Sequence, residues 1–405
     1  MDLNVIIVND SASITGGAEK VAIFSAIGLA NRGIHVVFFS AVFPIDKSLL
    51  EAGVKVICLN QRDILNEPNR LNAVKQGWWN VKARKEFDKL LQNYSPLNTV
   101  IHFHSWTKAL SSSLFSVTAK YHFSVIITSH EYFTVCPNGG MFDYQKMHIC
   151  ELKPMSLQCA LCNCDVRNYP QKVWRFIRQI IQNYEIRRNR LYMIFISQLT
   201  HDILLPYLYP ILERSYIVNN PIDINLKEPV PIVNNDTYLF MARLSQEKGV
   251  ELFCQAMTDL NLKGCVLGDG YLLQSLRRKY PSVYFAGWVT GEDKEKLIRK
   301  GKALIFPSLW YEGAPLTIME MKSYGIPCIV PDKCAASEQI IDGETGFIFK
   351  TGNLFSLEQA ILKYENSNLM DMHNKLLESF SAKDYSLVHH IDNLIKVYND
   401  IIHQQ

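Results

Sequence analysis

Short apolar runs alternate with longer segments of helical periodicity along most of the chain. In the first half these runs are Val5–Val8, Val36–Phe39, Val100–His104, Ser124–Ser129 and Met193–Ser197. A second series, YLFMA, GCVLG, VYFAG, ALIFPS, CIVPD and GFIFK, lies between Tyr238 and Lys350. Apolar runs of four to six residues separated by helices are typical of parallel strands that are covered on both faces. The pattern therefore predicts an α/β fold with two doubly wound parallel sheets.

A segment rich in Asn and Pro, between residues 219 and 236, separates the two series and is typical of a linker. A chain of 405 residues also exceeds what one core usually holds. We expect an N-terminal domain over residues 1–220, a second domain over 221–385, and a C-terminal helix over 386–405 that could pack back on the first domain. Ligands of such sheets bind beyond the carboxyl ends of the strands, so we expect a site in a cleft between the domains.

The charge of the chain is unevenly distributed. Residues 1–220 carry 23 Lys and Arg against 16 Asp and Glu, a net charge of +7, and the remainder has a net charge of −4. The excess includes the basic segment 171–190, which could rest on an anionic membrane or meet a pyrophosphate-bearing substrate. It could equally be a packed helix with a solvated basic face. The sequence shows neither a leader peptide nor a membrane span, so we expect a cytoplasmic protein.

Two glutamates, Glu312 and Glu320, lie on either side of a Gly-Ala-Pro turn. Pro315 is predicted in the first turn of a helix, where its missing N–H has no cost. Glu312 would then precede the helix and Glu320 would lie about one turn inside it. A helix N-terminus suits phosphates and hydroxyls. Glu320 could accept hydrogen bonds from the two hydroxyls of a ribose, and Glu312 could orient a sugar, although solvated glutamates also occur at this spacing by chance.

Three further motifs follow predicted strands. Arg243 and Lys248 in MARLSQEKGVELF could neutralise a diphosphate, although two surface cations are the simpler interpretation. Gly16 and Gly17 in TGGAEK would let a phosphate or sugar approach the backbone, but a dinucleotide cofactor is poorly supported because the full G-x-G-x-x-G is missing. His130 comes just after a strand, where a site would lie.

Taken together, these motifs resemble the donor-binding domain of family 4 glycosyltransferases, which are retaining enzymes of the GT-B fold. The resemblance rests on a set of residues in the second half and on a looser match in the first. These residues are Arg243, Lys248-Gly249, Gly268-Asp269-Gly270, FAGWV ending at Val289, Glu312 to Pro315, Glu320 and EQIIDGETGFIF, and, in the first half, Gly16-Gly17, Glu19, His130 and FISQ.

The resemblance implies transfer of a sugar, with retention, from a nucleotide diphosphate sugar to a growing surface glycan, which we expect to be lipid-linked, at the inner face of the membrane. Arg243 and Lys248 would stabilise the leaving diphosphate, Glu320 would hold the ribose, and His130 would approach the sugar from the other domain. Glu312 would grip the sugar with the backbone of Gly313, Ala314, Pro315, Leu316 and Thr317, and Gly16, Gly17, Gly268 and Val289 complete the expected donor site.

The absence of a D-x-D triplet fits catalysis without a metal ion or other cofactor, with the leaving phosphate taking the acceptor's proton. Nothing in the sequence suggests nucleic acid as a partner. Two alternatives stay open: another GT-B enzyme such as a nucleotide-sugar epimerase, and a non-catalytic sugar-binding subunit. Turnover of the donor alone would indicate the epimerase.

Five of the ten cysteines fall within 29 residues of an expected loop over residues 131–165. In a cytoplasmic protein such clustering favours metal ligation over disulfides. Cys159 and Cys162 have the spacing of a zinc knuckle, and Cys136 and Cys150 could complete a Cys₄ site, with Cys164 as the alternative to Cys162. A structural zinc would fix the loop next to His130; a loop with reduced thiols is the alternative.

Overall fold

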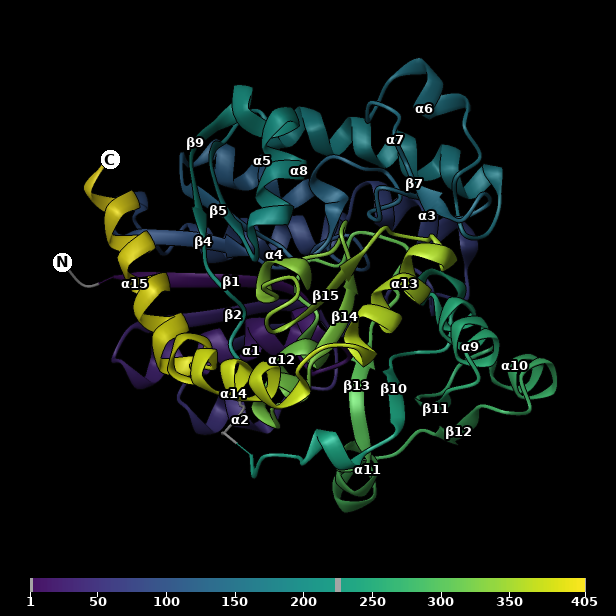
Figure 1. The fold of residues 1–405 in the computed structure, drawn as a ribbon. Coiled ribbons are helices and arrows are strands. Elements are labelled where there is room, and N and C mark those ends of the chain that lie inside the picture. The colour runs from purple at the N-terminus through teal and green to yellow at the C-terminus, as the bar shows by residue number, and fades with distance from the viewer. Residues whose placement is uncertain (1–2, 223–226, 405) are drawn as a thin grey trace. The chain divides into compact units, whose positions relative to one another are not determined.

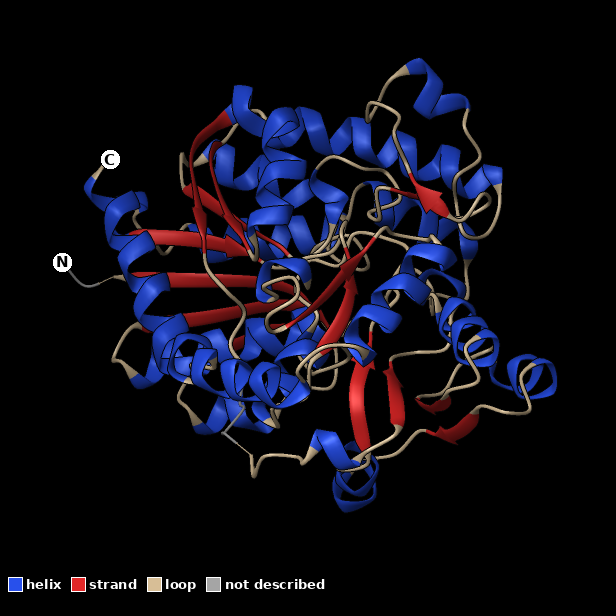
Figure 2. Cartoon of the chain, viewed as in Figure 1, coloured by secondary structure: helices blue, strands red, loops and turns tan. Residues whose placement is uncertain are grey.

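The computed structural model describes residues 3–222 and 227–404, which form two compact units (Figure 1). Unit 1 comprises the described residues of Met1–Gly140, Leu152–Asp223 and Asp384–Gln405. Unit 2 comprises those of Met141–Glu151 and Ile224–Lys383. Both units are α/β, with strands surrounded by helices (Figure 2). None of the helices in the described ranges is long and apolar enough to cross a membrane.

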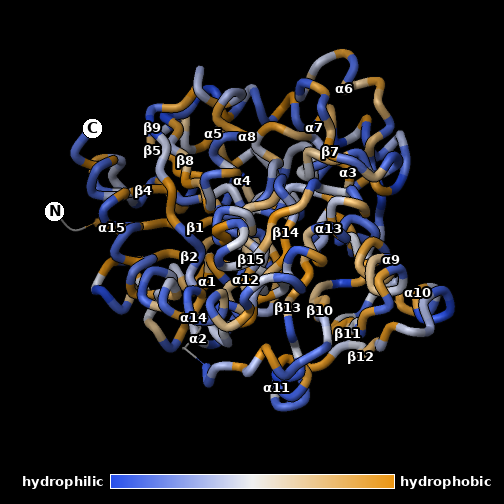
Figure 3. The backbone as a smooth tube through the Cα atoms, in the orientation of Figure 1, coloured by the Kyte–Doolittle hydropathy of each residue, from blue (hydrophilic) through white to orange (hydrophobic). Residues whose placement is uncertain are grey.

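The described part of unit 1 contains a seven-stranded parallel sheet with the order β3-β2-β1-β4-β5-β8-β9. Its central strands are buried on both faces, which is why they read as continuous apolar runs and appear orange in Figure 3. The strands are β1 (Asn4–Ser11), β2 (His35–Val42), β3 (Lys55–Cys58), β4 (Thr99–Phe103), β5 (Ser124–Ser129), β8 (Arg190–Phe195) and β9 (Leu212–Ile217).

The sheet of unit 1 is covered by helices from both ends of the chain. The helices are α1 (Gly17–Asn31), α2 (Lys47–Glu51), α3 (Arg70–Trp78), α4 (Val81–Leu91), α5 (Ser113–Lys120), α6 (Leu157–Leu161), α7 (Tyr169–Ile186), α8 (Gln198–Leu208) and α15 (Leu387–His403). Helix α15 packs on α1, where a Cβ at Gly28 would lie 2.5 Å from the side chain of Ile391. The Tyr398 hydroxyl of α15 also hydrogen bonds Nδ1 of His102 on β4, at 2.7 Å.

The described part of unit 2 contains a six-stranded parallel sheet with the order β12-β11-β10-β13-β14-β15. Apolar cores lie on its two faces. The strands are β10 (Thr237–Met241), β11 (Lys263–Leu267), β12 (Tyr284–Gly287), β13 (Gly301–Ile305), β14 (Cys328–Pro331) and β15 (Gly346–Phe349). The helices are α9 (Val250–Asp259), α10 (Leu273–Lys279), α11 (Gly291–Ile298), α12 (Leu316–Ser323), α13 (Leu354–Glu365) and α14 (Leu369–Ser379). The predicted fold class, α/β with two doubly wound parallel sheets, is confirmed.

Two segments differ from the sequence predictions. The expected loop over 131–165 contains α6 and a short antiparallel hairpin, β6 (Phe142–Asp143) and β7 (His148–Ile149), and its part Met141–Glu151 groups with unit 2. In the expected linker, residues 223–226 lie outside the described residues. Its later residues Val230 and Ile232 are buried in a core of unit 2, so this part is packed and is not a free linker.

Short 3₁₀ turns complete the chain. They are η1 (Pro96–Asn98), η2 (Tyr132–Thr134), η3 (Tyr209–Ile211), η4 (Ile232–Asn234), η5 (Gln246–Lys248), η6 (Ser337–Gln339) and η7 (Lys383–Tyr385).

Candidate functional site

The loops that follow β10, β11 and β13 meet at the carboxyl edge of the unit 2 sheet, and glycines allow them to approach. Gly249 has a φ of 70°, and a Cβ there would lie 1.9 Å from the carbonyl oxygen of Pro307. Gly268 has a φ of 154°, and a Cβ there would lie 1.9 Å from the carbonyl oxygen of Ala242. A side chain at either position would force the loops apart. Both glycines therefore fix how the loops carrying the predicted site residues pack together.

Lys248 and Glu312 form an ion pair between the loops after β10 and β13. The Glu312 carboxylate also accepts hydrogen bonds from Ser308 Oγ at 3.1 Å and Trp310 Nε1 at 2.7 Å. The Lys248 ammonium lies 5.1 Å from the centre of the Trp310 ring. The two charged side chains are only 18 % and 14 % exposed. The cation is thus held at the rim of the sheet by Glu312 and Trp310.

Arg243, by contrast, makes a single hydrogen-bonded ion pair within the described chain. Its Nη2 donates to Glu247 Oε1 at 2.9 Å, and that oxygen also accepts from Ser245 Oγ at 2.6 Å. Glu247 is buried, whereas the Arg243 side chain is 67 % exposed. A guanidinium has five N–H donors in a planar fork. Most of these donors therefore face solvent and could bind an anion.

Helix α12 begins at Leu316, and Pro315 is its N-cap, with φ −74° and ψ 105°. The prediction that Pro315 lies within the first helical turn was therefore wrong by one residue. Its ψ is extended, because the chain turns into the helix only at the following residue. In the described chain no side chain caps this helix end, so its first N–H groups are available to a ligand. Among the neighbouring predicted residues, Gly313, Ala314 and Thr317 are half-buried and Leu316 is exposed.

Glu320 lies on α12 as predicted, but it is already paired. Lys294 of α11 places its ammonium 2.6 Å from one Glu320 carboxylate oxygen and 2.8 Å from the other. Both side chains are half-buried. A ribose that binds Glu320 would therefore share this carboxylate with Lys294 or displace it. Val289, on the loop after β12, packs against the core beside this region.

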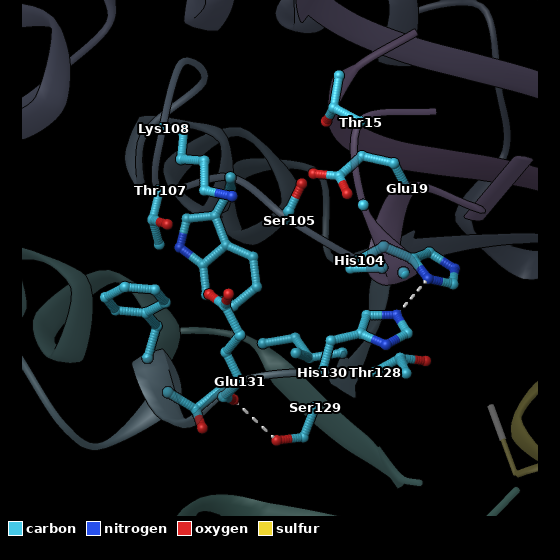
Figure 4. A pocket seen from close by; sticks show the side chains of 17 residues that line it. Thr15, Glu19, His104, Ser105, Thr107, Lys108, Thr128, Ser129, His130 and Glu131 are labelled. Carbon is cyan, nitrogen blue, oxygen red and sulfur yellow. Dashed lines mark hydrogen bonds between the residues drawn. The ribbon is translucent and has the colours of Figure 1, made fainter. Parts of the chain in front are cut away.

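A pocket of about 180 Å³, lined by polar and apolar side chains, lies in unit 1 (Figure 4). It is formed by the N-terminus of α1 and by the loops after β4 and β5. Its lining includes Gly16, Gly17, Glu19, His104, Ser105, Trp106, Lys108, His130 and Glu131. The structure thus brings Gly16, Gly17 and His130 together in one pocket.

The loop after β4 is held in place by Asp10, at the end of β1. The buried Asp10 carboxylate accepts hydrogen bonds from the backbone N–H groups of Lys108, Ala109 and Leu110, at 2.9, 2.8 and 2.9 Å. Burial raises the pKa of Asp10, while these hydrogen bonds and the charge of Lys108 lower it. Asp10 therefore positions Lys108 in the pocket. The sequence analysis did not select it, although an Asp that ends an apolar strand was a usable signal.

His130 is paired with a second histidine that the sequence analysis missed. His104 Nδ1 lies 2.9 Å from His130 Nε2, and the rings stack with centroids 5.2 Å apart (Figure 4). Burial, followed by the charge of His390, lowers the pKa of His130 to about 3. His130 is therefore neutral at physiological pH. Its role towards a sugar stays a prediction.

Gly16 and Gly17 differ in what surrounds them. A Cβ at Gly16 would lie 2.9 Å from Glu19 Oε2, whereas a Cβ at Gly17 would meet no atom of the described chain within 4 Å. The backbone at Gly17 therefore borders open space, as a ligand-binding glycine should.

The cysteines of the 131–165 segment gather partly around a lysine. The ammonium of Lys172, which is fully buried, lies 3.4 Å from Cys159 Sγ, and Asn138 Nδ2 donates to Cys164 Sγ at 3.1 Å. Desolvation raises the pKa of the Cys164 thiol to about 12, although the nearby Lys172 charge lowers it. Cys136 is buried as well.

Among the described residues, no group of three or more His, Cys, Asp or Glu side chains is placed to hold a metal ion. Cys150, one of the four expected ligands, falls in the segment that groups with unit 2. Cys136, Cys159 and Cys162 are likewise not part of such a group among the described residues. The structural zinc stays a prediction, which metal analysis of the purified protein would test.

Comparison with known proteins gives one family match and several distant relatives. Residues 223–383 match the family described as Glycosyl transferases group 1. An Escherichia coli UDP-Gal:alpha-D-GlcNAc-diphosphoundecaprenol alpha-1,3-galactosyltransferase is 23% identical over 194 residues, which cover 44% of this chain and 49% of that protein. The lipopolysaccharide 1,6-galactosyltransferase of Escherichia coli K12 is 27% identical over 172 residues, 38% of this chain and 48% of that protein. The chain thus spans about half the length of the curated relatives it matches.

Solved structures match over nearly the whole chain. HepE of Anabaena, in complex with UDP, has a TM-score of 0.65 at 15% identity and covers 98% of this chain and 100% of its own. Sucrose-phosphate synthase of Thermosynechococcus elongatus has a TM-score of 0.66 at 14% identity, with both chains fully covered. At these identities the likeness shows the fold, which is that of GT-B glycosyltransferases.

Proposed function

We propose that this protein is a glycosyltransferase that moves a sugar from a nucleotide diphosphate sugar to a glycan acceptor. The observation that carries the proposal is the arrangement of Arg243, Lys248, Glu312 and Glu320 at the carboxyl edge of the unit 2 sheet. This arrangement lies within the residues that match the glycosyltransferase family. The carboxyl edge of a parallel sheet is where such folds bind nucleotides.

In the proposed reaction the bond between the anomeric carbon and the diphosphate breaks, and negative charge develops on the leaving diphosphate. Lys248, held by Glu312 and Trp310, supplies a fixed positive charge there. Arg243 adds a fork of exposed donors that suits phosphate oxygens. A positive charge that is already in place needs no reorganisation as the reaction proceeds, and removing one such group typically costs about 2.7–4 kcal/mol of transition-state stabilisation.

The remaining steps are proposed on the family resemblance. Transfer proceeds with retention and without a catalytic metal ion, and the leaving phosphate takes the acceptor's proton. Glu320, whose carboxylate is paired with Lys294, binds the ribose hydroxyls. Glu312 orients the sugar and also holds Lys248 in place.

We further propose a lipid-linked acceptor of a surface glycan, such as an O-antigen, a capsule or an exopolysaccharide. Two relatives are named for transfer to a diphosphoundecaprenol-linked sugar and for lipopolysaccharide galactosyl transfer, respectively. The net charge of +7 on residues 1–220 suits a protein that works at an anionic membrane from the cytoplasmic side.

A thermal-shift screen tests the donor part of the proposal, since a nucleotide that binds the folded state raises its stability by RT ln(1 + [L]/Kd). UDP is the first nucleotide to try because the HepE structure contains it. We expect a nucleoside diphosphate and its sugar to stabilise the protein and inorganic phosphate not to. Turnover of the donor should then require an added acceptor, supplied as an extract of glycan lipids. Turnover of the donor without an acceptor would indicate an epimerase. Binding of the donor without any turnover would indicate a sugar-binding subunit.

A further inference from the structure

Helix α7 is amphipathic, but its polar face is the one that packs against the protein. Its buried side chains include Lys172, Arg178, Gln179, Gln182 and Glu185. Both sequence interpretations of this segment placed its basic residues at the surface. That expectation was wrong for Lys172 and Arg178, because each finds partners inside unit 1.

The buried face of α7 is fastened by hydrogen bonds to the loops beneath it. Arg178 Nη1 donates to the Thr107 carbonyl at 3.1 Å, and the guanidinium lies 5.1 Å from the centre of the Phe133 ring. Gln182 Nε2 donates to the Phe133 carbonyl at 2.7 Å, and its Oε1 accepts from Trp106 Nε1 at 2.9 Å. These contacts fix the rotation of the helix about its axis, so its opposite face must point away from unit 1.

That opposite face is apolar and exposed. Its side chains recur at intervals of four, four, three and four residues, the spacing of one helix face: Tyr169, Val173, Ile177, Ile180 and Tyr184. The preceding helix α6 adds Leu157 and Leu161, which are 76 % and 68 % exposed. The Tyr169 hydroxyl donates to the Ala160 carbonyl of α6 at 3.1 Å, which joins the two helices. We call these seven residues the α6–α7 face.

The exposed charges of residues 152–190, the stretch that carries the α6–α7 face, are of one sign. Lys153, Arg167, Arg187 and Arg188 are exposed along residues 152–190. The two carboxylates of this fully described stretch, Asp165 and Glu185, are buried and pair with Arg175 and Arg188. An apolar helix face bordered by the exposed cations Lys153, Arg167 and Arg187 would repel a second copy of itself, but it matches the interface of an anionic bilayer.

We propose that the α6–α7 face is a membrane-docking surface that inserts its apolar side chains into the headgroup region of an anionic bilayer. An amphipathic helix in this position lies parallel to the membrane, with its apolar side buried among the lipids and its cations near the phosphates. Tyr169 and Tyr184 lie at the two ends of the row of exposed side chains on α7. Their amphipathic rings favour the headgroup region of a bilayer. The inference deepens the proposed function, on which it rests for its purpose: it brings the enzyme to a lipid-linked acceptor.

Sedimentation of the full chain with vesicles tests the proposal without catalysis. We expect binding to vesicles of phosphatidylglycerol and phosphatidylethanolamine at low salt, and little binding to pure phosphatidylcholine. The double variant Ile177→Glu, Ile180→Glu should lower the partition coefficient at least tenfold. Arg167→Gln and Arg187→Gln should each lower it about fivefold at low salt, as loss of one near-surface cation predicts.

A matched control is Val388→Glu with Leu362→Glu, which places the same charges at two exposed apolar positions on other helices, α15 and α13. It should bind vesicles as the wild type does. Equal binding by the Ile177 and Ile180 variant, or no binding by the wild type, would overturn the proposal. A dimer that this variant dissociates would also overturn it, in favour of self-association. A nucleotide thermal shift on the same samples shows whether the donor site, and thus the proposed function, survives independently.

Discussion

The Lys248 ammonium and the Glu312 carboxylate are joined across two loops at the carboxyl edge of the unit 2 sheet. Each is predicted to have a role towards the donor, and each also neutralises the other in a largely buried place. Their contributions to stability and to catalysis can be separated by comparing a variant that lacks one partner with a variant that lacks both. Only the first leaves a buried charge without its counterion.

We predict that Lys248→Met lowers the free energy of unfolding by about 1–3 kcal/mol, because the Glu312 carboxylate is left with only neutral donors. The double variant Lys248→Met, Glu312→Gln should recover most of this stability, since no buried charge then lacks its counterion. Activity should stay low in both. Urea unfolding and steady-state kinetics of the two variants measure this, and recovery of activity together with stability would mean that Lys248 acts only in folding.

Glu320→Gln should weaken binding of the nucleoside diphosphate, because a charge-assisted hydrogen bond to the ribose becomes a neutral one. Glu312→Gln should instead lower kcat more than it weakens nucleotide binding. Lys294→Met is the matched control: it breaks the same ion pair as Glu320→Gln but leaves the carboxylate in place. Calorimetric titration of the variants should find near wild-type affinity for Lys294→Met. An equal loss in Glu320→Gln and Lys294→Met would show that the ion pair, rather than the ribose contact, matters.

Gly17→Ala should reduce kcat/KM at least tenfold without destabilising the protein. A Cβ at this position meets no atom of the described chain within 4 Å, and Gly17 is the first residue of α1. Replacing a helical Gly by Ala is expected to leave stability unchanged or to raise it by about 0.4–1 kcal/mol. A variant that is equally stable and fully active would remove Gly17 from the binding site.

The buried side chain of His102 should make the stability of unit 1 sensitive to acid. Burial, followed by the charges of His130 and His390, lowers its pKa to about 3, whereas an unfolded His has a pKa near 6.5. Between these values the unfolded state takes up the proton first, so the free energy of unfolding falls as the pH falls below about 6.5. The slope is about 1.4 kcal/mol per pH unit for one such group.

Urea unfolding at pH 7.5 and at several values down to pH 5 measures this slope. His102→Gln should make the dependence shallower, and His403→Gln, at an exposed position, should leave it unchanged. An unaltered slope in His102→Gln would mean that this histidine does not govern the acid sensitivity.

The sequence predicted the strands that are buried on both faces, because burial alone produces their continuous apolar runs. It did not predict β3 or β9. β9 is an edge strand with the sequence LERSYI, whose polar side chains face solvent and leave no such run. The sequence also could not predict how α7 is rotated about its own axis. Its periodicity shows an apolar and a polar face, but only the partners in the folded chain decide that the polar face is buried.

The candidate site was predictable residue by residue but not in its pairings. Arg243, Lys248, Glu312 and Glu320 each lie in a motif of local sequence. Their partners Glu247 and Trp310 lie only four and two residues away in the sequence, whereas Lys294 reaches Glu320 through tertiary structure. Trp310 could have been selected from the sequence, since it stands two residues before Glu312. Lys294 could not have been selected, since it is 26 residues from Glu320 and lies on an exposed, charged helix with no distinguishing pattern.

The central claim, that cations at the edge of the unit 2 sheet stabilise a leaving diphosphate, is tested most directly at Arg243. Its side chain is largely exposed, so Arg243→Ala should leave the unfolding temperature nearly unchanged. The measurement is kcat/KM for nucleoside diphosphate release from the sugar donor in the presence of acceptor. We predict a fall of about 30- to 1000-fold for Arg243→Ala, which corresponds to about 2–4 kcal/mol of transition-state stabilisation, and a change of less than about twofold for the exposed control Arg278→Ala. A folded Arg243→Ala variant with the wild-type kcat/KM would contradict the account.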